Sequence, residues 1–71
     1  MAALSKRSLL LAGHATSLAL EPSFWAVLEQ MAAHKAVSLP ALLVDLDAER
    51  GEASLASTCR VAALQWTQHR P

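Results

Sequence analysis

The chain has 71 residues, of which 54% are hydrophobic and 17% charged, and its formal net charge is zero. This length allows one domain, and this hydrophobicity excludes disorder, which needs low hydrophobicity and high net charge. A lone domain of this size is marginally stable without a staple or a partner, and a single cysteine excludes an intrachain disulfide. Self-association is therefore the expected source of stability.

The charges are distributed unevenly along the chain. Residues 1–20 and 53–71 each carry two basic and no acidic residues, whereas residues 36–52 carry four acidic residues and one basic residue. The basic pair Lys6 and Arg7 is followed by an apolar run, as in a secretory signal, but Gly13 and polar residues interrupt that run. It is also shorter than the roughly 20 apolar residues that span a bilayer. We expect a cytoplasmic protein that does not contact membranes.

A β-strand is predicted from Ala15 to Leu20, because hydrophobic character alternates with period two. One face carries Thr16, Leu18 and Leu20 and is expected to be buried. The opposite face carries Ala15, Ser17 and Ala19 and is expected to point outward.

The segment Lys6–Leu11 is either a loose arm or a second strand that completes a β-ribbon region over residues 6–20. Its connection is expected to be a two-residue type II′ turn at Gly13-His14, since glycine suits the first central position of that turn. An isolated two-stranded hairpin is marginal in water. The ribbon must therefore pair with another copy or lie on the helices.

Three helices are predicted, over residues 22–36, 38–50 and 54–69. Pro22 suits the first helical position, Ser38 and Ser54 begin the later helices, and Gly51 ends the second. Each helix carries an apolar stripe at helical spacing. The stripes comprise Phe24, Val27, Leu28 and Met31, then Leu39, Leu42, Leu43 and Leu46, then Leu55, Cys59, Ala62, Ala63 and Trp66.

No catalytic or metal-binding set is found, so we predict no enzymatic activity, cofactor or metal. The three histidines, His14, His34 and His69, lack ligand spacing. Cys59 lies on an apolar helix face and is predicted to be a buried, inert thiol. The alternating acids that begin at Asp45 do not fit a calcium loop, because the glycine comes one position late and an alanine stands where the bidentate glutamate belongs.

A series of short motifs, in their order along the chain from about Lys6 to about Trp66, resembles the sequence of small bacterial ribbon-helix-helix proteins. The resemblance is carried by Lys6-Arg7-Ser8, Ala12-Gly13-His14, Thr16-Ser17, Leu20-Glu21-Pro22, Phe24-Trp25, Asp47-Ala48-Glu49-Arg50-Gly51, Ser54-Leu55 and Arg60.

This resemblance implies a mainly α-helical protein with a short β-ribbon, forming an intertwined homodimer with an additional C-terminal helix. It also implies a DNA-binding, transcription-regulator-like function, with the ribbon in the major groove and phosphates at the second helix N-terminus. The expected DNA-binding residues are Lys6, Arg7, Ala15, Ser17, Ala19, Ser38, Leu39 and Ala41. The expected dimer core comprises Thr16, Leu18, Leu20, Phe24, Leu28, Leu42, Leu43 and Leu46.

An alternative function is a protein-interaction or antitoxin-like dimerisation module without sequence-specific DNA binding. Base readout uses bidentate side chains, which Ala15, Ser17 and Ala19 do not supply. If Lys6–Leu11 adds a strand on each side of the dimer, the sheet becomes about 14 Å wide, against a major groove of about 12 Å. Such a sheet would not enter the groove.

Overall fold

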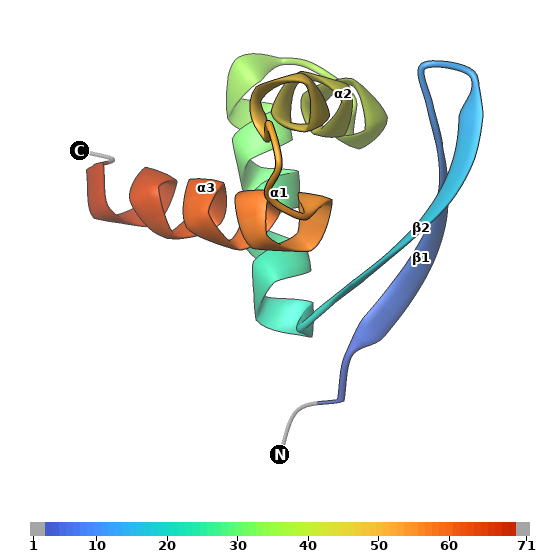
Figure 1. The fold of residues 1–71 in the computed structure, drawn as a ribbon. Helices are drawn as coiled ribbons and strands as arrows, with labels where there is room; N and C mark the ends of the chain where they lie inside the picture. The colour runs from blue at the N-terminus through green and yellow to red at the C-terminus, as the bar shows by residue number, and fades with distance from the viewer. Residues whose placement is uncertain (1–2, 70–71) are drawn as a thin grey trace.

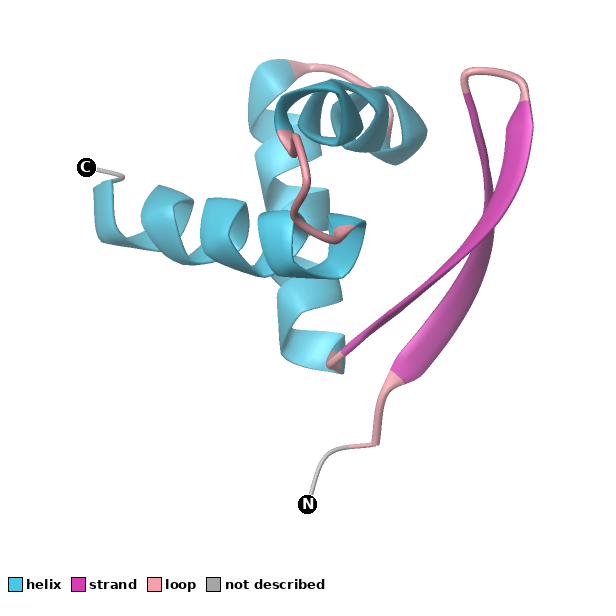
Figure 2. Ribbon diagram, viewed as in Figure 1, coloured by secondary structure: helices cyan, strands magenta, loops and turns pink. Residues whose placement is uncertain are grey.

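The computed structural model describes residues 3–69, which form a β-hairpin followed by three helices (Figures 1 and 2). This arrangement confirms the predicted mainly α-helical fold with a short β-ribbon and an additional C-terminal helix. The elements are β1 (Ser5–Leu11), β2 (His14–Leu20), α1 (Pro22–Lys35), α2 (Leu39–Glu49) and α3 (Leu55–His69). Within residues 3–69, no helix has the length and apolar character needed to cross a membrane.

The hairpin turn differs from the predicted one. Leu11 pairs with His14, so the two central residues are Ala12 and Gly13 rather than Gly13 and His14. Both central residues have positive φ, 51° for Ala12 and 82° for Gly13, as a type I′ turn requires. The prediction was wrong because a glycine fits either turn, at the first central position of type II′ or the second of type I′.

The helix ends are set by local backbone chemistry. Helix α1 ends in a Schellman motif, in which the Ala36 N–H donates to the Ala33 carbonyl at 3.1 Å and the Val37 N–H to the Ala32 carbonyl at 3.0 Å. Ser38 Oγ accepts from the Ala41 N–H at 3.1 Å, which confirms the predicted cap of α2. At the start of α3, Ser54 Oγ likewise accepts from the Ser57 N–H at 3.0 Å.

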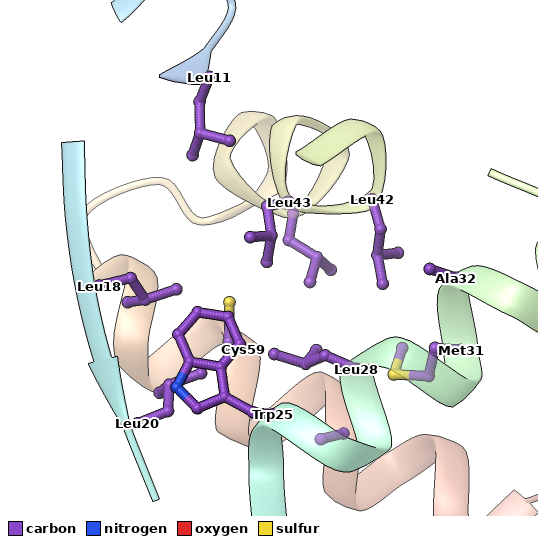
Figure 3. Close-up of a cluster of buried hydrophobic side chains, with 12 residues drawn as sticks. Leu11, Leu18, Leu20, Trp25, Leu28, Met31, Ala32, Leu42, Leu43 and Cys59 are labelled. Atoms are coloured by element: carbon purple, nitrogen blue, oxygen red, sulfur yellow. The ribbon is translucent and has the colours of Figure 1, made fainter. Parts of the chain in front are cut away.

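A hydrophobic core forms between one face of the hairpin and the three helices (Figure 3). Twelve buried residues contribute: Leu11, Leu18, Leu20, Trp25, Leu28, Met31, Ala32, Leu42, Leu43, Leu46, Cys59 and Ala63. The accessible surface of the chain is 4705 Å², close to the roughly 4300 Å² expected for a folded monomer of this mass. One chain therefore forms its own core. Strand β1 and helix α3 cover apolar surface of β2, α1 and α2 that would otherwise be exposed.

An ion pair links helix α3 to the junction of β2 and α1. Arg60 Nε donates to Glu21 Oε1 at 2.9 Å, and the Arg60 guanidinium lies 6.0 Å from the centre of the Phe24 ring. The Arg60 hydrogen bond holds the pKa of Glu21 below its ordinary value. Next to Arg60, Cys59 is fully buried, and burial raises the pKa of its thiol to about 11. The burial of Cys59 agrees with the prediction.

Candidate nucleic-acid interface

The side of the hairpin that faces away from the helices carries four small side chains together with one lysine and one leucine. We call this surface the outer ribbon face: it consists of Lys6, Ser8 and Leu10 from β1 and Ala15, Ser17 and Ala19 from β2. In the register, Lys6 is opposite Ala19, Ser8 is opposite Ser17 and Leu10 is opposite Ala15. The predicted outward residues of β2 therefore lie together on one open face, with Lys6 as its cation.

Arg7, predicted beside Lys6 as a DNA contact, lies on the opposite face of β1. Its Nη1 donates to Glu29 Oε1 at 2.8 Å, and its guanidinium lies 4.4 Å from the centre of the Trp25 ring. The Trp25 indole Nε1 donates in turn to the Ser5 carbonyl at 2.7 Å. These contacts attach β1 to α1 and direct the Arg7 charge toward the helices rather than outward.

One edge of β2 is open. Among residues 3–69 the sheet has two strands, with β1 on one side of β2. The Leu11 and His14 pair flanks a two-residue turn, so it exchanges hydrogen bonds, and the same holds for every second pair along the hairpin. Even-numbered residues of β2 therefore bond to β1, while the N–H and C=O groups of Ala15, Ser17 and Ala19 point to the open edge. A further strand could pair there.

The N-terminus of α2, predicted as a phosphate site, has few available donors. Ala41 already donates to Ser38 Oγ, and Pro40 has no N–H. Leu42 donates to the Ser38 carbonyl at 3.1 Å. In this first turn the Leu39 N–H is left for a ligand, together with the exposed Ser38 hydroxyl as a second donor.

The residues predicted to form a dimer core are placed inside a single chain. Leu18, Leu20, Leu28, Leu42, Leu43 and Leu46 are buried, while Thr16 and Phe24 are half-buried. The predicted dimer core did not include Leu11 and Trp25, which are also buried. Core or interface packing is the prediction for Trp25, which lies beside the apolar stripe of α1, whereas Leu11 stands in a run of three leucines with no alternation.

The described part of the chain contains no cluster of metal-ligating side chains. Over residues 3–69, no group of three histidine, cysteine, aspartate or glutamate side chains is arranged to hold a metal ion. Asp47 and Arg50 form an ion pair, with Arg50 Nε 2.5 Å from Asp47 Oδ1. It lies at the end of α2 and does not extend the outer ribbon face.

Comparison with known proteins agrees with this geometry. Residues 4–67 match the ribbon-helix-helix domain. A solved structure of an uncharacterized protein from Bordetella pertussis Tohama I is similar, with a TM-score of 0.80 and 38% sequence identity over 93% of this chain. The match spans 57% of that protein, so this chain covers little more than half of its length. A comparison with curated proteins found no match. The chain belongs to the ribbon-helix-helix domain family.

Proposed function

We propose that the protein is a homodimeric DNA-binding protein of the transcription-regulator type, and that the outer ribbon face is its DNA-facing surface. The observation that carries the proposal is the open edge of β2 beside that exposed face, in a chain of a family whose members are typically DNA-binding regulators or antitoxins. Two copies pair their β2 strands antiparallel about Ser17, because the edge-facing groups of Ala15, Ser17 and Ala19 are symmetric about that residue.

The resulting sheet lies across the major groove instead of entering it. Four strands in the order β1-β2-β2-β1 are about 14 Å wide, more than the groove width of about 12 Å. In this sheet the two Lys6 residues, each opposite an Ala19, lie at opposite corners. Four residues of strand length and three strand spacings separate their Cα atoms by about 20 Å. The two ammonium groups therefore reach phosphates on the two sides of one groove.

DNA contact of this kind is mainly electrostatic and discriminates little between sequences. Lys6 supplies charge, while Ala15, Ser17 and Ala19 allow close approach without bidentate hydrogen bonds to bases. The Ser38 hydroxyl and the Leu39 N–H are the additional phosphate donors in this proposal, because neither is used as a donor in the α2 cap.

A second candidate function is a dimerisation module that binds another protein and not DNA. It is favoured by the presence of β1, which widens the sheet beyond the groove, and by the Arg7 contacts with Glu29 and Trp25. In that function the same β2 pairing forms the dimer, and the outer ribbon face contacts a protein.

Titration of random duplex DNA at two salt concentrations separates the two functions. Affinity falls steeply between about 50 and 200 mM salt if phosphates are neutralised, and Lys6→Gln reduces the slope of log affinity against log salt by about 2 per dimer. Lys35→Gln is the matched control, because Lys35 is exposed in the last turn of α1 and does not lie on the ribbon. A dimer that shows no duplex binding at low salt supports the protein-interaction module, and equal slopes for the two variants remove Lys6 from the site.

Proline substitution tests the dimer edge. Ser17 and Ser8 face each other across the hairpin, but their N–H groups point to opposite edges of the sheet. Ser17→Pro removes a donor from the β2 edge and abolishes both dimer and DNA binding, while Ser8→Pro removes a donor from the β1 edge and preserves both. Sedimentation equilibrium gives the masses. A dimer that survives Ser17→Pro and dissociates with Ser8→Pro contradicts the proposed pairing.

A further inference from the structure

Strand β1 contributes one buried side chain to the hydrophobic core. That residue is Leu11, at the end of the strand, and the other six residues of β1 are exposed or half-buried. Strand β2 buries two, Leu18 and Leu20. The turn between the strands adds strain, because Ala12 has a φ of 51°. Since apolar burial is the main favourable term in folding, β1 is the strand of the hairpin that detaches at the lower cost.

Arg7 makes part of the contact that holds β1 on α1. Its Nη1 lies 2.8 Å from Glu29 Oε1, and the two side chains are 38% and 54% exposed. An ion pair with this exposure contributes little to stability, and a phosphate in solution can compete with the carboxylate. The Arg7 guanidinium also covers the Trp25 ring, 4.4 Å from its centre. Arg7 is therefore a cation that the protein masks and that a phosphate can draw away.

The docked position of β1 keeps the sheet of the proposed dimer out of the major groove. Four strands are about 14 Å wide, against about 12 Å for the groove. The two β2 strands alone are one spacing of about 4.8 Å apart, and a two-stranded ribbon fits the groove. Detachment of β1 from β2 therefore converts a sheet that lies across the groove into a ribbon that enters it.

We propose that β1 is a releasable strand, and that Arg7 is a phosphate-binding residue held in reserve by Glu29 and Trp25. This inference rests on the proposed DNA-binding function and adds a second bound state to it. In the docked state each chain presents Lys6 alone from β1, whereas in the released state Lys6 and Arg7 both lie on a free segment that reaches phosphates beside the groove. The additional cation and the closer approach of β2 favour release on DNA, against the lost hydrogen bonds between β1 and β2.

The salt dependence of duplex binding tests the role of Arg7. Arg7→Gln lowers the slope of log affinity against log salt by about 2 per dimer, because two phosphates are no longer neutralised. Arg7→Lys keeps the charge and therefore the slope. The matched control is Arg50→Gln, which removes another ion-paired arginine, the partner of Asp47 at the end of α2, and leaves the slope unchanged.

The outcome for Arg7 is separable from that for the proposed function. A protein that binds duplex DNA with a slope that depends on Lys6 and not on Arg7 keeps the proposed function and overturns this inference. A dimer that binds no duplex DNA at low salt overturns both.

Removal of the carboxylate that masks Arg7 has the opposite effect. Glu29→Gln raises duplex affinity about threefold more than Glu49→Gln does, since both variants lose one negative charge but only the first frees an arginine. Glu49 is exposed at the end of α2. Equal effects of the two variants contradict the masking of Arg7 by Glu29.

Amide hydrogen exchange detects the release of β1 itself. In the docked state the N–H groups of Thr16 and Leu18 donate to β1, because even-numbered residues of β2 belong to hydrogen-bonded pairs. Addition of duplex DNA makes these two amides exchange faster, while the amide of Leu43 in α2 keeps its rate. Unchanged or slower exchange of Thr16 and Leu18 in the DNA complex means that β1 stays docked, and it overturns the proposal.

Discussion

Lys6 and Arg7 are neighbours in the sequence but have opposite environments. Lys6 is exposed on the outer ribbon face, while Arg7 pairs with Glu29 and stacks on Trp25. The sequence could not separate them, because Leu9, Leu10 and Leu11 follow one another and give no alternation from which to identify the buried face of β1. The candidate site was therefore predictable on β2, which alternates, and not on β1.

The raised pKa of Cys59 makes the free energy of unfolding fall in the alkaline range. Its thiol keeps the proton to a pKa of about 11 in the folded chain, against an ordinary value of 9.0. The contribution of this pKa difference to stability is complete below pH 9. It is lost as the pH rises toward 11, because the thiol of the unfolded chain ionises first. The free energy of unfolding falls by about 1.4 kcal/mol per pH unit over this range.

Denaturant titrations of the wild type and Cys59→Ala, from pH 8 to about 11, measure this effect. The difference in unfolding free energy between the two proteins narrows as the pH rises, because alanine does not titrate. A difference that stays constant contradicts the raised pKa of Cys59.

At the scale of elements, the helices were predictable and the hairpin turn was not. Caps at Ser38 and Ser54 and apolar stripes at helical spacing define the helices locally. The turn depends on register, and the two possible turns bury the same alternate residues of both strands. A choice between them rests on contacts with the helices, such as the Trp25 bond to the Ser5 carbonyl. Those contacts are distant in sequence and leave no local pattern.

The turn offers a stabilising substitution. Ala12 has φ of 51°, a left-handed conformation that is unfavourable for alanine and readily adopted by asparagine. Asn-Gly is the preferred pair in a type I′ turn. Ala12→Asn should therefore raise the free energy of unfolding by about 0.5–1 kcal/mol. Urea denaturation checks this value. Ala15→Asn, on the same hairpin in extended backbone, is the control and should not stabilise the protein.

At the scale of the whole molecule, a single chain contains the hydrophobic core that the sequence suggested two chains would share. The leucines predicted for a dimer core pack around Trp25 and Cys59 of the same chain. The sequence could not reveal this, because an apolar stripe indicates that a face is buried and does not say which chain covers it. Self-association is thus a property of the β2 edge in our proposal, and the core does not require it.

The consequence for Leu18 is a loss of folding instead of simple dissociation. Leu18 is 4% exposed, and an aspartate there places a charge in the core of the single chain. Leu18→Asp should lower the free energy of unfolding by about 3–5 kcal/mol, a large part of the total for a small domain. Ser17→Pro, one residue away on the outer face, should give a folded monomer. Circular dichroism with sedimentation distinguishes the two, and a folded Leu18→Asp monomer contradicts the single-chain core.

The surroundings of the Trp25 indole make its fluorescence sensitive to the position of β1. Because its nitrogen is bonded to the first carbonyl of β1 and its ring lies under a guanidinium, the emission of this fluorophore reports whether the N-terminal strand is docked. Trp66, whose ring lies 6.1 Å from that of His34, can be replaced by phenylalanine to leave a single emitter. The protein thus carries an intrinsic probe for following strand detachment in real time.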